Sequence, residues 1–355
     1  MLREFFEKYQ VDDDVIAVGV SGGADSLALL LQLEAFLRPQ GRRVVALTVD
    51  HGLRPESREE AEYVAGLAAE HQIEHHILTW EGKKPEKGIE EAARTARYNL
   101  LCDWCVCNGV RTLAVAHHLL DQAETFLMRL QRGSGLSGLC GMAFVCKKNN
   151  IRLIRPFLSV HPEKLKEFLC VKNVSWVEDA SNACDDYLRV RTRKFLPQLA
   201  AVLDITPERI VDTMSVLSRS RDCLEEQAMS FIQQQVCRYE QSGVSVDIVQ
   251  LSNQHEEICF RVLCSLLKEV GRREYIPRAD DVERLQKRLF DVTFRGATLS
   301  DCEIFPFRHK LWIVPELKGQ VRLSKNDWKA YVALHPQYEK LVLPYKLKLS
   351  LYKSS

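Results

Sequence analysis

The sequence predicts an α/β fold, a doubly wound and mostly parallel sheet, followed by a helical second domain. Three observations support it. Apolar runs rich in Val and Ile alternate with helically spaced segments over the first half of the chain. Polar or glycine-rich turns follow several of these runs. The alternation then stops after Pro197, where helical spacing takes over. A chain of 355 residues is also too long for one ordinary domain.

The first predicted strand, residues 16–20, leads into a turn and a Leu-rich helix. The turn consists of Ser21, Gly22, Gly23, Ala24, Asp25 and Ser26. Two adjacent glycines let a ligand approach the backbone, and the following helix directs free N–H groups to the same place. We therefore expect an anion site, with phosphate as the usual ligand. The turn has neither the Lys-Ser/Thr of a Walker loop nor the G-x-G-x-x-G of a dinucleotide-binding turn. The alternative is a plain turn that Asp25 caps.

Further strands are predicted at residues 43–49, 74–80 and 112–116, with helices at 59–71 and 88–107. Asp50 and His51 follow the second strand, and His117 and His118 follow the fourth. Ligands of such folds lie beyond the carboxyl ends of the strands. We therefore expect the three loops to meet at one crevice.

After Pro197, Thr206 caps a long helix that is predicted to reach about Tyr239. Two more helices, at 254–270 and 279–289, and a β-like segment at 298–314 follow. The predicted division is therefore a catalytic domain at 1–200, a helical domain at 201–320 and a short basic tail at 321–355.

The charge balance, 49 basic against 48 acidic residues, gives no overall case for nucleic acid, so an RNA surface must be a local patch. Twelve cysteines without a regular framework, no signal peptide and no bilayer-spanning stretch indicate a cytoplasmic protein without membrane attachment. The oligomeric state stays open, with a homodimer as one option.

The turn at residues 21–26 resembles the SGGxDS loop of the N-type ATP pyrophosphatases, the PP-loop superfamily. Four further segments resemble motifs of the bacterial tRNA(Ile)-lysidine synthetases and occur in the same order. These segments are DHGLRPES at 50–57, EAARTARY at 91–98, AHHLLDQAET at 116–125 continued by RGSG at 132–135, and DASN at 179–182 with RVRTR at 189–193. The resemblance covers about residues 15–197.

This resemblance implies an ATP-dependent ligase that joins lysine to C2 of the wobble cytidine of tRNA(Ile) with the CAU anticodon. The reaction would pass through an adenylated cytidine and release pyrophosphate and AMP. ATP, free L-lysine and this tRNA would be the partners, and the helical domain would grip the tRNA.

The resemblance and the chemistry together suggest site residues. Residues 21–26, with Asp50 and His51, would bind ATP, and Asp25 would also hold a Mg²⁺ ion. Asp121 and Glu124, at i and i+3, share a helix face and would bind the lysine ammonium or take its proton. The alternative for this pair is a solvated acidic face at a helix N-terminus.

Several arginines complete the predicted site. Arg97 would stabilise charge on the α-phosphate, and Arg189 would reach the site. The predicted catalytic set is Asp25, Arg97, Asp121, Glu124 and Arg189. Arg191, Arg193 and Lys194 would contact tRNA phosphates, unless they are ordinary solvated surface.

Cys102, Cys105 and Cys107 leave one alternative open, a sulfur-transferring tRNA thiolase. Because the chain has no second CxxC and these cysteines follow an apolar helix face, we expect buried packing and no iron–sulfur cluster. A nucleotide-binding module without catalysis is a further alternative.

Overall fold

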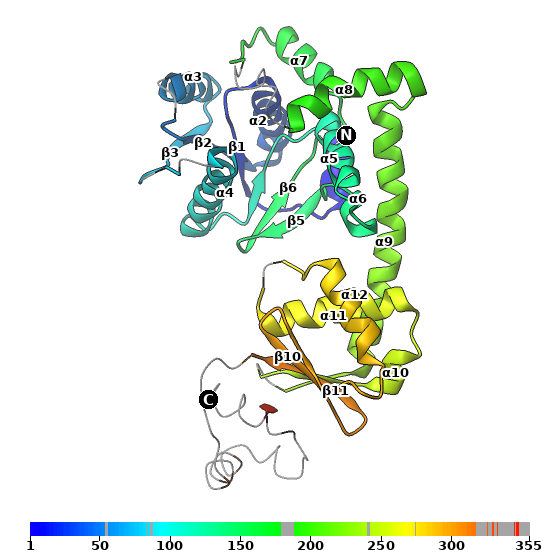
Figure 1. The fold of residues 1–355 in the computed structure, drawn as a ribbon. Helices are drawn as coiled ribbons and strands as arrows, with labels where there is room; N and C mark the ends of the chain where they lie inside the picture. The colour runs from blue at the N-terminus through cyan, green and yellow to red at the C-terminus, as the bar shows by residue number, and fades with distance from the viewer. Residues whose placement is uncertain are drawn as a thin grey trace. The chain divides into compact units, whose positions relative to one another are not determined.

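The computed structural model describes residues 1–53, 56–82, 84–85, 88–178, 188–239, 242–273 and 275–316, and single positions at 325, 329, 332, 344, 346 and 347. It divides into two compact units, Met1–Ser218 and Arg219–Ser355 (Figure 1). The division falls within one long helix, α9 (Pro207–Gln235). The motif at 179–182 and nearly all of the predicted tail at 321–355 lie outside the described residues.

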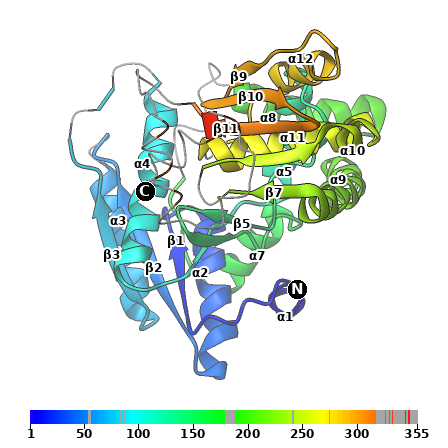
Figure 2. The same cartoon turned by 90° about the horizontal axis from the view of Figure 1, so that it is seen from below.

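The first unit contains a six-stranded sheet in the order β3-β2-β1-β4-β6-β5. Its strands are β1 (Val15–Gly19), β2 (Arg43–Asp50), β3 (Glu74–Thr79), β4 (Thr112–Ala114), β5 (Val145–Lys148) and β6 (Ile151–Ile154). Only β5, at the edge, is antiparallel to its neighbour. Strands β3, β2 and β1 lie side by side in Figure 2. From β1 the chain proceeds to β2 and β3 on one side and returns to β4 on the other. The loops after β1 and β4 therefore flank a topological switch point, where such sheets bind ligands.

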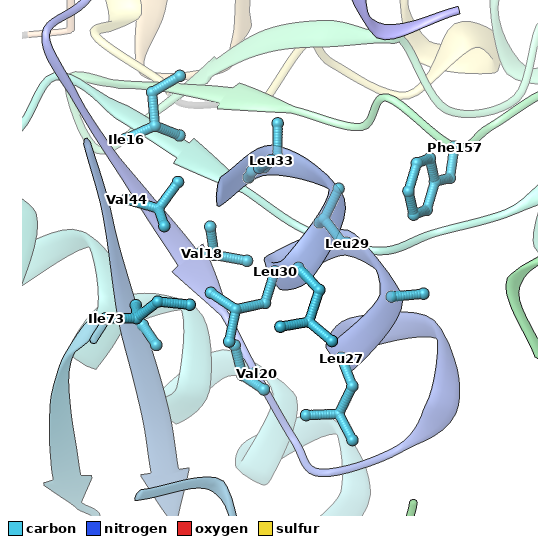
Figure 3. Close-up of a cluster of buried hydrophobic side chains, with 14 of the residues drawn as sticks. Ile16, Val18, Val20, Leu27, Leu29, Leu30, Leu33, Val44, Ile73 and Phe157 are labelled. Carbon is cyan, nitrogen blue, oxygen red and sulfur yellow. The ribbon is translucent and has the colours of Figure 1, made fainter. Parts of the chain in front are cut away.

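Helices cover both faces of this sheet, because both faces of its central strand are apolar. Ile16 and Val18 of β1, and Val20 directly after it, pack with helices α1 (Leu2–Lys8), α2 (Ala24–Leu37), α3 (Glu56–Glu70) and α7 (Pro162–Val171). Figure 3 shows these side chains gathered with Leu27 and Leu30 of α2. The alternate residue Ala17 belongs to a second cluster with α4 (Ile89–Cys107). This packing holds the N-terminus of α2 directly after β1.

Three further helices of the first unit form a separate packing group. They are α5 (Leu119–Gln131), α8 (Leu188–Leu203) and the first part of α9, joined through Ala123, Leu196, Ile210 and Met214. A short helix, α6 (Leu136–Leu139), follows α5, and a 3₁₀ turn, η1 (Arg38–Gln40), follows α2. The apolar contact between α5 and α8 fixes which side chains of α8 can reach α5.

The second unit combines helices with a five-stranded antiparallel sheet in the order β7-β8-β11-β10-β9. Its elements are β7 (Val236–Arg238), β8 (Val244–Asp247), α10 (Ile248–Ser252), α11 (Glu256–Gly271), α12 (Ala279–Leu289), β9 (Ala297–Leu299), β10 (Cys302–Phe307) and β11 (Lys310–Pro315). Val262 and Leu266 of α11 share a core with Ile304 and Ile313 of the sheet. No helix within the described residues combines the length and apolarity needed to cross a bilayer.

The predicted fold class is confirmed, with an antiparallel sheet added to the second unit. The β-like segment at 298–314 is confirmed as β9–β11, and the helix at 279–289 is confirmed in full. The extension of the long helix to Tyr239 was wrong, because α9 ends at Gln235 and β7 begins at Val236. The apolar spacing continues smoothly across this junction, so periodicity did not reveal it. The β5–β6 hairpin was also not foreseen.

Candidate active site

The loop between β1 and α2 is closed around the hydroxyl of Ser26. This hydroxyl donates to the carbonyl of Gly23 at 2.9 Å and accepts from the N–H of Ser21 at 3.1 Å. Gly22 has a φ of +82°, a left-handed conformation that glycine adopts without strain. The first N–H groups of α2 have no acceptor within the helix, and the positive end of the helix dipole lies at the same place. The loop therefore has the construction of an anion site.

The loop after β2 lies beside it in the sheet order. Asp50 is buried, and its Oδ1 accepts from the N–H of Gly52 at 2.9 Å, which closes the turn. The ring of His51 meets the ring of Trp80 edge-to-face, with centroids 6.0 Å apart. Burial lowers the pKa of His51, and the nearby positive charge of Arg97 lowers this pKa further. His51 is therefore a neutral imidazole at pH 7.

The loop after β4 ends at His118, which caps α5. The N–H of Asp121 donates to Nδ1 of His118 at 3.4 Å, and the N–H of His118 donates to Oδ2 of Asp121 at 3.0 Å. Because Nδ1 accepts, the ring proton belongs on Nε2, which lies 3.5 Å from Oδ2 of Asp25. His118 thus connects the N-termini of α2 and α5. Its spacing to Asp121 is that of a capping box, a signal that the sequence interpretation did not use.

Asp25 has one carboxylate oxygen without a protein partner. Its Oδ1 is buried and makes no hydrogen bond with any described residue. Burial raises the pKa of Asp25 and the charge of Asp121 raises it further, whereas His118 opposes both effects. A buried carboxylate oxygen without a partner is costly, and a hard cation with oxygen ligands would satisfy it. Asp25 therefore offers one oxygen ligand for such a cation, whereas the described residues contain no group of three or more His, Cys, Asp or Glu side chains that could hold a metal by themselves.

Asp121 and Glu124 are buried on one face of α5 and paired with arginines of α8. Arg189 donates from Nε to Glu124 at 2.7 Å and from a terminal nitrogen to Asp121 at 2.6 Å. Arg193 donates from Nε to the other oxygen of Glu124 at 2.6 Å. The alternative interpretation of these two residues, a solvated acidic face, was therefore wrong. The sequence could not reveal these pairs, since it does not specify the rotation of α8 against α5.

This pairing sets the charge of Asp121 and Arg189. Burial alone would raise the pKa of Asp121, but His118 and Arg189 outweigh burial, so the pKa is lowered. Burial would likewise lower the pKa of Arg189, but Asp121 and Glu124 raise it. Asp121 is therefore ionised at pH 7 and is a weak base.

Arg97, on α4, completes the charged site. Burial lowers the pKa of Arg97, Tyr98 opposes this effect, and the positive charges of Arg94 and Arg189 lower the pKa further. Arg97 therefore lies within electrostatic reach of both Arg189 and His51. Cationic groups that destabilise one another in this way favour an anion between them.

His117 was left open by the sequence. Burial lowers its pKa to about 3, Asp121 opposes the effect, and Arg155, Arg94 and Arg189 add to it. Its Nδ1 is buried and has no hydrogen-bond partner within the described part of the chain. His117 is thus a neutral imidazole close to the acidic residues.

The structure brings together the loop at 21–26 and the predicted residues Asp25, Asp121, Glu124 and Arg189, with Arg97 in electrostatic reach. Arg191 and Lys194 lie elsewhere on α8, where they line a hollow of about 320 Å³ with Phe195 and Gln198.

The three cysteines of α4 differ in their surroundings. Cys102 and Cys105 are buried in the apolar cluster beneath α4, whereas Cys107 is exposed, so its predicted burial was wrong. Burial raises the pKa of Cys105 to about 12, and the neighbouring Cys102 adds to the effect. Both buried cysteines are therefore packed as neutral thiols.

Comparison with known proteins agrees with this geometry. The family profile of the PP-loop domain matches residues 1–199. A tRNA(Ile)-lysidine synthase from Wolbachia sp. subsp. Brugia malayi is 32% identical over 322 residues, which cover 89% of this chain and 74% of the relative. This chain belongs to the tRNA(Ile)-lysidine synthase family. A second member, from Ruegeria pomeroyi, is 38% identical over 264 residues, covering 74% of this chain and 62% of that protein.

The lysidine synthase family shares its fold with other PP-loop enzymes. A solved U34-tRNA thiolase from Methanococcus maripaludis, which carries a 4Fe–4S cluster, matches with a TM-score of 0.50 and 16% identity. The match covers 61% of this chain and 80% of the thiolase. At this identity the likeness concerns the fold alone. The resemblance inferred from the motifs is confirmed by the family match.

Proposed function

We propose that this chain ligates lysine to C2 of the wobble cytidine of tRNA(Ile) with the CAU anticodon, using ATP. The observation that carries the proposal is the junction at His118, which joins the anion-binding loop to two buried acids held by Arg189. A single site then contains one region that would bind triphosphate and a second region that would bind a cationic amine. Membership of the lysidine synthase family supports this pairing of substrates.

In the first step, the N–H groups at the start of α2 would hold the β and γ phosphates of ATP. The O2 of the cytidine attacks the α-phosphorus, the bond to the β-phosphate oxygen breaks, and pyrophosphate leaves. Arg97 and Arg189 stabilise the charge that develops on the α-phosphate. Asp25 would hold the Mg²⁺ ion, which when bound neutralises phosphate charge.

In the second step, the amine of lysine attacks C2 of the adenylated cytidine. The bond between C2 and O2 breaks, AMP leaves with its electron pair, and the nitrogen loses a proton to water. Asp121 and Glu124 would bind and orient the amine. Because the pKa of Asp121 is lowered, this carboxylate is better suited to attracting the ammonium than to removing its proton.

The tRNA is held partly by α8 in this proposal. Arg191 and Lys194 flank the half-exposed Phe195, a combination that suits RNA phosphates and an unpaired base. The sequence suggested the same role for Arg193. Because Arg193 donates a hydrogen bond to Glu124, we propose instead that it contributes to the acidic part of the site. A cytoplasmic location fits the described cysteines, all of which are thiols.

The test is transfer of labelled lysine to tRNA. The chain is incubated with ATP, labelled lysine and tRNA(Ile) carrying either the CAU or a UAU anticodon. We expect ATP-dependent label in the CAU tRNA alone, because the 4-amino group of cytidine makes its O2 nucleophilic, whereas uridine has a carbonyl at that position. Label from a sulfur donor in place of lysine would contradict the proposal in favour of a thiolase. ATP binding without any transfer would contradict it in favour of an inactive module.

A further inference from the structure

Arg155 lies at the same edge of the first sheet as the candidate site, although neither proposed step involves it. It directly follows β6, which runs parallel to its neighbour β4. Where these two strands end, the N–H of Val115 donates to the carbonyl of Ile154 at 3.0 Å. Arg155 is therefore next to the loop after β4, which contains His117 and leads to Asp121.

The guanidinium of Arg155 contacts a carbonyl and a sulfur, and no carboxylate, within the described part of the chain. One terminal nitrogen donates to the carbonyl of Ala143 at 2.8 Å and to Sγ of Cys146 at 3.4 Å. Its Nε is buried and has no hydrogen-bond partner among the described residues. A charge that is withdrawn from water needs a counter-charge. The side chain is therefore suited to an anionic ligand.

The ring of His117 has a second polar atom of this kind. Its Nδ1 is buried and makes no hydrogen bond with any described residue. Arg155 lowers the pKa of His117 and Asp121 raises it, so the imidazole lies within electrostatic reach of both. A neutral imidazole with its proton on Nδ1 donates one hydrogen bond there. The ends of two neighbouring strands thus supply two donors, Nδ1 of His117 and Nε of Arg155.

The order of the strands favours a carboxylate over a phosphate as the anion. The proposed phosphate loop follows β1, on one side of β4, whereas Arg155 follows β6, on the other side. The acids that would bind the amine begin the helix after β4, between the two. Free L-lysine carries a single anionic group, its α-carboxylate, in the same molecule as its ammonium groups. Acids with a cationic group beyond them match this arrangement of charges.

We propose that Arg155 and His117 bind the α-carboxylate of the substrate lysine. Each donates to one carboxylate oxygen, while the two acids of α5 bind an ammonium group of the same molecule. The inference rests on the proposed function and adds the residues that select a free amino acid over a simple amine. Such a site discriminates strongly, because its buried donors stay unpaired when the analogue lacks the carboxylate.

The test compares labelled lysine with labelled cadaverine, the same diamine without the carboxylate, as substrates for ligation to the CAU tRNA. We expect wild type to use lysine with a kcat/KM roughly 10- to 100-fold above that for cadaverine. Arg155→Ala should lower kcat/KM for lysine by a similar factor and leave the value for cadaverine near that of wild type. His117→Ala should show the same selective loss. Equal losses with both amines, or a raised KM for ATP or tRNA instead, would overturn the proposal.

Two further variants serve as controls. Arg155→Lys keeps a cation with a different geometry, so its preference for lysine over cadaverine should lie between those of wild type and Arg155→Ala. Arg152→Ala, near the other end of β6, removes an arginine that donates to the carbonyl of Gln10 at 3.0 Å and should not change this preference.

The comparison of the two amines by wild type does not depend on the stability of any variant. Equal use of lysine and cadaverine by wild type would overturn this inference and leave the proposed function intact. If wild type transfers neither amine to the tRNA, the proposed function fails, and this inference fails with it.

Discussion

Nε2 of His118 lies 3.5 Å from Oδ2 of Asp25, and this contact joins the helix that follows the phosphate loop to the helix that carries the acids. The same imidazole accepts the N–H of Asp121 through Nδ1. One side chain thus sets the distance between the proposed triphosphate site and the proposed lysine site. Because the contact needs both side chains, replacing either His118 or Asp25 would remove this link between α2 and α5.

Replacing His118 separates its capping role from its link to Asp25. His118→Ala loses both, so we expect lower thermal stability, by about 1 kcal/mol from the lost cap, and slower ligation. His118→Asn supplies another good capping side chain but not the ring that reaches Asp25. Its melting temperature should lie near that of wild type while ligation stays slow. Ligation at the wild-type rate in His118→Asn would contradict the role given to this link.

Asp121→Ala should impair lysine transfer and leave ATP binding intact. We expect ATP binding close to that of wild type, because the loop at 21–26 is intact, and lysine transfer reduced by roughly a hundredfold or more, as for other losses of a charged group in a site. Isothermal titration with ATP and labelled lysine transfer measure the two effects. ATP affinity that falls in step with transfer would show that Asp121 does not act on lysine. Asp121→Asn, which keeps the size of the side chain, controls for the lost cap.

The stability of the chain should depend on His117 in mild acid. Burial lowers the pKa of His117 to about 3, while in the unfolded chain this pKa is near 6.5. Below pH 6.5 the unfolded chain therefore takes up a proton that the folded chain refuses, and stability falls as the pH falls towards 3. The slope from this one group is at most about 1.4 kcal/mol per pH unit. Urea denaturation between pH 4.5 and 7 should give His117→Asn a shallower slope than wild type, and equal slopes would refute the assignment.

Gly22 and Gly66 provide a matched pair of glycine substitutions. Gly22→Ala forces alanine to a φ of +82°, so we expect a loss of about 1–2 kcal/mol and weaker ATP binding. A Cβ at Gly66, inside α3, would meet no atom within 4 Å. Gly66→Ala should therefore stabilise the chain by about 0.5–1 kcal/mol and leave ATP binding unchanged. Thermal unfolding and ATP titration of both variants test this, and a harmless Gly22→Ala would count against the need for glycine at this position.

The buried cysteines of α4 should matter for stability and not for chemistry. Cys102→Ala with Cys105→Ala removes two packed thiols, so we expect a loss of about 1–3 kcal/mol of stability. The rate of lysine transfer at a temperature where the variant is folded should stay near that of wild type. Abolished transfer in a folded double variant would point to sulfur chemistry.

The fold was largely predictable because its strongest signals are local. The apolar run into Ser21–Ser26 and the helical spacing after it identified β1, the loop and α2, and the separation of Asp121 from Glu124 placed both on one helix face. Weak signals were missed. The β5–β6 hairpin has Lys147 and Lys148 in one strand and is only four residues long in each, so its pattern resembles a polar loop.

The partners of the site residues were less predictable than the residues themselves. Arg189 and Arg193 were recognised as basic positions, but their pairing with Glu124 depends on how α8 packs against α5 through the apolar cluster that includes Leu196 and Ala123. Tertiary contacts of this kind join segments more than sixty residues apart. Local spacing contains no information about them.

In the proposed reaction, one site first adenylates the cytidine and then exchanges AMP for lysine. A pulse and chase tests it most directly. ATP labelled in the α-phosphate is incubated with the chain and CAU tRNA(Ile) without lysine, and unlabelled lysine is then added. We expect label on the tRNA during the pulse and its release as AMP in the chase, in proportion to the lysine incorporated. Label that never reaches the tRNA, or that appears on lysine instead, would contradict it.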